Sequence, residues 1–292
     1  MRKNEPRNEQ KTDKNQIVGG ILYLVATPIG NLSDISQRAL KVLSEVDIVA
    51  AEDTRNTGKL LAYFGISKPM ISYFEHNKRE RGEAILEKLK EGLSCALVTD
   101  AGTPAISDPG EDLVRLCAEN GVPVTSIPGC CAVINALALS ALSTGRFCFE
   151  GFLSTNKNER IDRLNEIKND TRTTIFYEAP HKLLKTLEDL LEHFGDRKIS
   201  LCRELTKLNE EIIRTTIGGA IEHYTTNAPR GEYVLVVEGC TRKNEDAFWS
   251  NMSIEEHLDF YVNQGLKKMD AIKSVAKDRN LPKNEVYKIV NT

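Results

Sequence analysis

The sequence is poor in the residues and runs that define several large classes of protein. Its 292 residues include only five scattered histidines, and no apolar run approaches the ~20 residues that a helix needs to cross a bilayer. The polar start from Met1 to Gln16 lacks the apolar stretch of a signal peptide. These absences disfavour a metal cofactor and a membrane span, and they predict a cytoplasmic protein.

Disulfide and dinucleotide signatures are missing as well. The seven cysteines form no C-x-x-C pair, and the adjacent Cys130 and Cys131 suit neither zinc nor an ordinary disulfide, so we expect reduced, mostly buried thiols. The loop after Ile21–Val25 has one glycine where a dinucleotide fingerprint needs three, which disfavours a nicotinamide or flavin cofactor. The formal net charge of −3 gives no global basic surface, so any nucleic-acid site has to be a local patch.

What the sequence does contain is centred on the stretch from Ala96 to Gly110. An apolar run ends at Asp100 and is followed by a dense group of turn-forming residues, which predicts a buried strand that opens onto a loop. Loops at the carboxyl ends of strands in α/β sheets are common ligand sites. A tight strand-to-helix connection with Asp100 as a helix cap would give the same pattern.

Apolar runs and amphipathic stretches alternate from Ile21 to Ala141, which predicts a mostly parallel sheet. The run 122–127 carries a proline and is therefore expected near a sheet edge or at a strand start. Further strands are expected between Phe147 and Val237. The predicted fold is α/β, with two α/β domains and a small C-terminal helical module. The expected boundaries are 1–16 for a flexible polar tail, 17–130 and 131–241 for the two α/β domains, and 246–292 for the helical module.

Charged clusters follow several of the predicted strands. Glu52–Thr57 and Arg203–Lys207 each come directly after a buried run, so we expect them at a sheet edge or in a cleft. Acids at the amino terminus of a helix would explain Glu52 and Asp53 equally well. The basic and aromatic stretch Glu75–Arg81 is suited to nucleic-acid backbone, although solvated helix starts have the same composition.

The C-terminal module has a local excess of positive charge. Between Gln264 and Thr292 there are seven lysines and arginines against three acids, which fits a nucleic-acid handle or, equally, solvated helix faces. The periodicity predicts a small helical core made of Ile254, Leu258, Tyr261, Ala271, Ile272, Val275, Val286, Tyr287 and Ile289.

Six ordered motifs stand out along the chain. They are Thr27–Leu32, Ala51–Arg55, Asp100–Gly110, Phe147–Leu153, Phe176–Glu178 and Arg203–Lys207. Together they resemble the ribosomal RNA small subunit methyltransferase I family, within the tetrapyrrole-methylase superfamily. The resemblance runs from about Gly20 to Gly239 and, more loosely, through the helical module.

The resemblance implies a homodimeric, two-lobed enzyme that binds S-adenosylmethionine between its lobes. Such an enzyme would methylate the ribose 2′-hydroxyl of a cytidine in the decoding region of 16S rRNA or of the small ribosomal subunit. The implied methyl-donor site uses the loops that contain Pro28, Gly30, Asp100, Gly102, Thr103, Ala105, Ile106, Cys131, Ala132 and Tyr177.

Methyl transfer to a ribose hydroxyl requires a group that removes the proton or stabilises the oxyanion. The candidate bases are Glu178, Glu204 and Asp53, and we hypothesise that Glu178 and Glu204 line the acceptor side. The basic candidates for holding RNA phosphate or stabilising charge are Arg55, Arg203 and Lys207.

Two alternative functions are compatible with the same motifs. One is methylation of a carbon of a tetrapyrrole, of the precorrin type, although the charged clusters and the basic module favour RNA. The other is a non-catalytic S-adenosylmethionine-binding protein associated with the ribosome, which would bind the donor without turnover.

Overall fold

The computed structural model describes residues 16–241, 248–249, 251–279 and 281–290. The predicted polar tail lies outside this range except for Gln16. Contacts divide the chain into two compact units, Met1–Gly239 and Cys240–Thr292. Within the described ranges, no helix has the length and apolar character needed to span a membrane.

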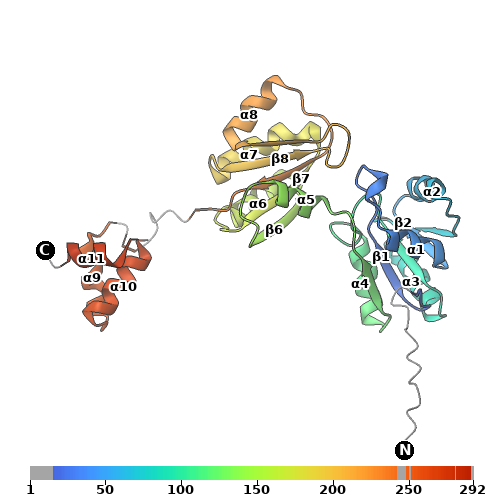
Figure 1. Ribbon diagram of the computed structural model, residues 1–292, viewed down its shortest axis with the longest axis horizontal. Helices are drawn as coiled ribbons and strands as arrows, with labels where there is room; N and C mark the ends of the chain where they lie inside the picture. Colours follow the sequence, from blue (N-terminus) through green and yellow to red (C-terminus); the bar gives the residue numbers. More distant parts are fainter. Residues whose placement is uncertain (1–15, 242–247, 250, 280, 291–292) are drawn as a thin grey trace, which may run out of the picture. The chain divides into compact units, whose positions relative to one another are not determined.

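The first unit begins with a five-stranded sheet in the order β3-β2-β4-β1-β5 (Figure 1). All its neighbouring strands are parallel, which confirms the fold predicted from the strand and helix alternation. The strand that follows Pro123 lies at the sheet edge, as predicted. The strands are β1 (Leu22–Val25), β2 (Ile48–Ala51), β3 (Met70–Ser72), β4 (Cys95–Val98) and β5 (Val124–Ile127).

Helices cover both faces of this sheet because its strands are apolar on both sides. Side chains of α1 (Gln37–Glu45) and α2 (Thr54–Tyr63) pack in one core cluster. Those of α3 (Lys78–Lys90) and α4 (Gly110–Glu119) pack in another. After β1 the chain crosses over β4 to reach β2, whereas after β4 it crosses over β1 to reach β5. Adjacent strands whose connections leave in opposite directions leave a crevice at their carboxyl ends, where ligands of open α/β sheets bind.

A second five-stranded sheet has the order β6-β7-β10-β8-β9. Only β6 and β7 are parallel, and the other neighbours pair antiparallel. The strands are β6 (Phe147–Phe152), β7 (Thr173–Glu178), β8 (Lys198–Arg203), β9 (Glu211–Thr216) and β10 (Tyr233–Val237).

The two faces of the second sheet have different partners. One face packs against α6 (Lys157–Ile167), α7 (Leu183–Phe194) and α8 (Ile217–Thr226). The other packs against α5 (Ala132–Leu139), which follows directly on β5 of the first sheet. Short 3₁₀ turns at Leu32–Asp34 and Pro180–Lys182 complete this unit. Because side chains alternate along a strand, each strand residue is committed to one of these two environments.

The described residues of the C-terminal unit form three helices, α9 (Ile254–Asn263), α10 (Lys268–Asp278) and α11 (Lys283–Ile289). Seven of the nine predicted core residues pack in its core. The prediction is wrong for Tyr287 and Ile289, which are 48% and 37% exposed. The short α11 presents a single face to its neighbours, and Val286 and Val290, four residues apart, occupy it.

Candidate functional site

The loops at the carboxyl ends of β1 and β4 contact each other directly. The backbone N–H of Thr27 donates to the carbonyl of Gly102 over 2.9 Å, and the N–H of Gly102 donates back over 3.0 Å. The Thr27 hydroxyl also donates to the carbonyl of Thr99 over 3.2 Å. The loop after β5 joins them, because the Thr103 hydroxyl donates to the carbonyl of Cys130 over 2.9 Å. Three loops predicted to bind the methyl donor therefore form one structure.

The loop after β4 is held in an uncommon conformation. Ala105 and Ser107 have φ values of 66° and 62°, in the left-handed region that favours glycine. The carboxylate of Asp108 holds this turn by accepting from the N–H groups of Ala105 over 2.9 Å and Gly110 over 2.7 Å. Burial raises the pKa of Asp108, and its hydrogen bonds oppose that rise. The sequence marks Asp108 only as part of a motif. Its hydrogen bonds could not be predicted, because they depend on the conformation of the turn and not on the residue type.

Replacing Asp108 by alanine is expected to weaken donor binding about tenfold or more. The substitution removes charge-assisted bonds that each contribute about 1.5–3 kcal/mol to holding Ala105 and Ile106 in place. Titration calorimetry with S-adenosylhomocysteine measures the loss. Asp108→Asn keeps an acceptor oxygen and is expected to lose less affinity. Equal affinity in Asp108→Ala and the unsubstituted protein would show that this carboxylate does not position the loop.

An apolar wall next to this loop joins the two sheets. Ile29, from the loop after β1, packs with Cys131, Ala132 and Tyr177 in a core cluster of the second sheet. Burial raises the pKa of Tyr177 to about 12, so its phenol stays neutral. Of the predicted donor residues, those on the three loops and Tyr177 are thus brought to one region. Asp100 lies on its exposed side, where its carboxylate accepts from the Asn56 amide over 3.2 Å.

The loop between β8 and β9 carries a charged pair that contacts the loop after β1. A side chain built on Gly30 would place its Cβ 2.3 Å from Cγ of Lys207, so the lysine stem lies directly on Gly30 and glycine is required there. The Lys207 ammonium lies 2.9 Å from Oε1 of Glu204 and 3.8 Å from a carboxylate oxygen of Glu232. Lys207 holds the pKa of Glu204 below its usual range.

Backbone strain is concentrated in the loop after β4 and in the loop between β8 and β9. Of the five non-glycine residues with positive φ in the described part of the chain, four lie there, because Glu204 and Thr206 join Ala105 and Ser107 with φ values of 52° and 67°. Such residues gather at ligand-binding sites, where the surrounding contacts hold them in place.

Glu178 is not brought together with this pair. It is 3% exposed and shares the α7 face of β7 with Phe176, whereas Tyr177 points to the face of α5. Its carboxylate accepts from the N–H of Ala179 over 2.8 Å and from the Thr186 hydroxyl. Arg160 then links the Thr186 hydroxyl over 2.7 Å to Asp189 over 2.6 Å. Glu178 therefore belongs to a network that joins β7, α6 and α7.

Glu178→Gln is expected to lower the free energy of unfolding by about 1–3 kcal/mol and to leave the single-turnover rate of methyl transfer unchanged. The cost is that of weakening buried hydrogen bonds to Thr186 and Ala179. Urea unfolding and a rapid-quench assay measure the two quantities. A rate loss without a stability loss would instead assign Glu178 to catalysis, as hypothesised from the sequence.

The other charged candidates are paired locally. Asp53 is the N-cap of α2 and accepts from the N–H of Arg55 over 2.8 Å and from its guanidinium over 2.7 Å. These bonds lower the pKa of Asp53 to about 2, which makes it a weak base at neutral pH. The guanidinium of Arg55 remains open to solvent, whereas Arg203 is half-buried and lies 3.1 Å from Glu211. The Glu52 carboxylate accepts from the Thr99 hydroxyl over 2.8 Å.

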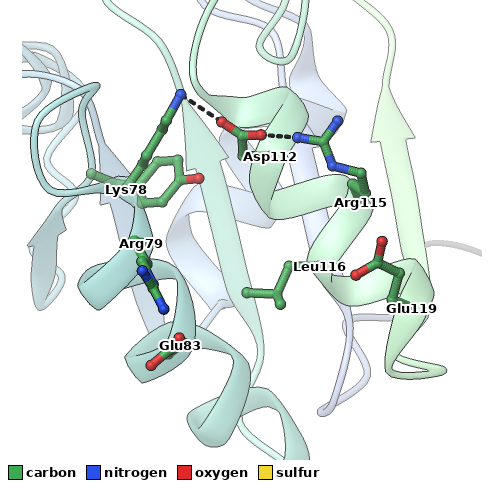
Figure 2. Close-up of a pocket in the computed structure, with 8 residues that line it drawn as sticks. Lys78, Arg79, Glu83, Asp112, Arg115, Leu116 and Glu119 are labelled. Carbon is green, nitrogen blue, oxygen red and sulfur yellow. Dashed lines mark hydrogen bonds and ion pairs between the residues drawn. The ribbon is translucent and has the colours of Figure 1, made fainter.

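A separate cavity of about 330 Å³ lies between α3 and α4 (Figure 2). None of the predicted donor residues lines it. It includes Lys78 from the basic and aromatic stretch, but the Lys78 ammonium lies 2.7 Å from Asp112 and 2.7 Å from Glu75. Arg115 also pairs with Asp112. Because Lys78 and Arg115 are already paired with carboxylates, the cavity is poorly suited to binding a phosphate.

Comparison with known proteins identifies the class of this α/β enzyme. Residues 21–221 match the family model described as Tetrapyrrole (Corrin/Porphyrin) Methylases. Since this range spans more than half of the chain, the protein belongs to the tetrapyrrole methylase family. The predicted superfamily, and the prediction that the chain is a methyltransferase, are confirmed.

Curated relatives carry a more specific name, "Ribosomal RNA small subunit methyltransferase I". The relative from Synechocystis sp. is 47% identical over 271 residues, 92% of this chain and 97% of its own length. The relative from Bacillus subtilis is 46% identical over 92% of this chain and 93% of its own length. The Thermotoga maritima relative, 46% identical, aligns over 99% of its own length but only 75% of this chain.

Solved structures share the fold at low sequence identity. A diphthine synthase superposes with a TM-score of 0.57 at 17% identity, covering 76% of this chain and 90% of its own. A cobalt precorrin-4 methyltransferase superposes with a TM-score of 0.55 at 19% identity, covering 75% of this chain and 95% of its own. These structures support the two-sheet architecture, which confirms the predicted fold class.

Proposed function

We propose that this methyltransferase transfers a methyl group from S-adenosylmethionine to the ribose 2′-hydroxyl of a cytidine in the decoding region of 16S rRNA, in the cytoplasm. The observation that carries this assignment is the Glu204–Lys207 pair on Gly30, an ionisable pair placed against the donor loop. The RNA substrate of the proposal is taken from the name of the curated relatives, which includes ribosomal RNA. Methylation of a tetrapyrrole carbon would not require a charged pair to act on a hydroxyl.

The residues present fit the proposed donor. Asp100 presents an exposed carboxylate that can accept from sugar hydroxyls or an amino group. Cys131, Ala132 and Tyr177 supply an apolar wall, and the loop held by Asp108 presents Ala105 and Ile106. Pro28, Gly30, Gly102 and Thr103 lie on the bridged loops. When bound, the donor supplies an electrophilic methyl group on a sulfonium.

The residues of this chain orient the acceptor hydroxyl, accept its proton and stabilise the oxyanion. In-line alignment of two reactants accounts for about 7–11 kcal/mol of barrier lowering in favourable cases. We assign Glu204 to accepting the hydroxyl proton and Lys207 to stabilising the oxyanion that forms. Arg55 and Arg203 remain candidates for holding RNA phosphate. Asp53 positions Arg55, and Glu178 supports the fold.

The experiment that tests this function incubates the full-length protein with donor labelled in its methyl group. The acceptors are purified small subunits, naked 16S rRNA and a tetrapyrrole precursor. The proposal expects label in small-subunit RNA, recovered after nuclease digestion as 2′-O-methylcytidine. Label in the tetrapyrrole alone, or donor binding without transfer to any acceptor, would establish one of the two alternatives. Sedimentation of the same sample tests the expected homodimer.

A further inference from the structure

An aromatic cluster lies at the end of β6, beside the loop that Asp108 holds. The ring of Tyr177 lies 4.9 Å from that of Phe149 and 5.5 Å from that of Phe152, measured between centroids. Phe149 and Tyr177 are partly buried, but Phe152 is 62% exposed. A large apolar ring held by two others yet open to solvent is an incomplete contact.

A β-bulge creates this arrangement. Phe149 pairs with Ile175 and Phe152 with Tyr177, so the four residues of β6 from Phe149 to Phe152 lie opposite the three residues of β7 from Ile175 to Tyr177. The extra residue places Phe149 and Phe152 on the same face, which strict alternation would not do. Bulges re-aim side chains in this way, and they are common beside active sites.

The neighbouring residue fixes the cluster against the donor loop. Gly151 has a φ of 65°, and a Cβ built on it would lie 3.1 Å from the Ser107 hydroxyl. Ser107 is itself one of the strained residues of the loop after β4. The next residue of β6, Phe152, thus lies at the border between the donor loop and solvent. β6 is an edge strand, so no further strand covers it.

We propose that Phe152 is the stacking platform for a nucleobase of the RNA acceptor, at or next to the methylated cytidine. This inference rests on the proposed function. When a ribose reacts beside the loop after β4, its own base or that of the next nucleotide lies close to that loop. Unstacked RNA bases bind by stacking on exposed aromatic rings. Phe152 is an aromatic ring that is both open and in that position.

The decisive variants are Phe152→Ala and Phe152→Trp, with Tyr63→Ala as the matched control. Tyr63 is a 67% exposed aromatic residue, but it is the last residue of α2, at the opposite end of that helix from the turn that follows β2 at the carboxyl edge of the sheet. Phe152→Ala is expected to raise KM for small-subunit RNA about 5- to 100-fold. Phe152→Trp is expected to keep the KM of the unsubstituted protein. Tyr63→Ala should leave the KM for small-subunit RNA unchanged. Calorimetry with S-adenosylhomocysteine should give the same donor affinity in all three variants.

Tryptophan fluorescence identifies what the platform contacts. The chain has a single tryptophan, Trp249, in the C-terminal unit, so the unsubstituted protein is the blank for Phe152→Trp. A cytidine-containing oligoribonucleotide is expected to quench the added signal, and S-adenosylhomocysteine alone is not. Quenching by S-adenosylhomocysteine would show that the ring serves the donor instead.

Three other results would overturn the inference. The first is an unchanged KM for RNA in Phe152→Ala. The second is a change in the sedimentation of Phe152→Ala, which would place Phe152 between two copies of the chain. The third is a change in KM seen only with a tetrapyrrole. Failure of the proposed function is distinguishable, because the unsubstituted protein would then transfer no methyl group to small-subunit RNA.

Discussion

Lys207→Met is expected to lower the single-turnover rate of methyl transfer by about 100-fold or more, with donor affinity little changed. Methionine keeps most of the apolar stem that lies on Gly30, so the substitution removes the ammonium without opening a large gap. Losing one preorganised donor to a developing oxyanion costs about 10²–10³ in rate in well-studied enzymes. Rapid-quench assays with saturating RNA and donor measure this step directly.

Lys185→Met is the matched control for this prediction. Lys185 also pairs with a carboxylate, Asp189, over 2.8 Å, but on α7 and on the face that lies away from the donor loop. Its replacement is expected to leave the rate unchanged. If both variants lost rate equally, or if Lys207→Met kept full activity, Lys207 would have no role in the chemical step.

The pH dependence of the same variant tests the assignment of Glu204. Lys207 holds the pKa of Glu204 below its usual value, so in the unsubstituted protein the carboxylate stays ionised until the pH falls below that range. Without Lys207, Glu204 takes up a proton at a higher pH. The residual activity of Lys207→Met is therefore expected to decline at a higher pH on the acid side. A loss that is uniform at every pH would mean that Glu204 does not titrate in the reaction.

The fold and the positions of the loops that follow its strands could be predicted from the sequence, because both depend on local pattern. Apolar runs that alternate with amphipathic stretches specify parallel strands with helices between them. Turn residues after a buried run then specify which ends carry loops. Thr27, Gly102 and Thr103 were placed correctly at the ends of their strands for this reason.

The side chains proposed for catalysis were harder to predict, because their position depends on which face of a strand a residue occupies. Tyr177 and Glu178 are neighbours in sequence, yet alternation sends Tyr177 toward the donor loop and Glu178 into the network with Thr186. Nothing in the local sequence tells which of the two faces meets the other sheet. The contact of Lys207 with Gly30 joins residues 177 positions apart, and the bulge at Phe149–Gly151 breaks alternation without a sequence signal.

Reversing two charges in the C-terminal unit is expected to weaken RNA binding about tenfold or more at low salt. Lys277 and Lys283 are exposed on α10 and α11, and seven lysines and arginines of this unit lie after Gln264, whereas α9 carries Glu255, Glu256 and Asp259. Each phosphate contact contributes about 0.7–0.9 to the slope of log affinity against log salt. Lys277→Glu with Lys283→Glu should therefore flatten that slope by about 1.4–1.8, as measured by filter binding across a salt series.

The matched control reverses Lys59 and Lys90, which are also exposed but lie on α2 and α3 of the first unit. The same change in net charge there is expected to alter affinity much less, because local contacts and not total charge would hold the RNA. At saturating RNA, both double variants should keep the single-turnover rate, since neither touches the Glu204–Lys207 pair. Equal losses in the two double variants would refute a dedicated RNA contact in the C-terminal unit.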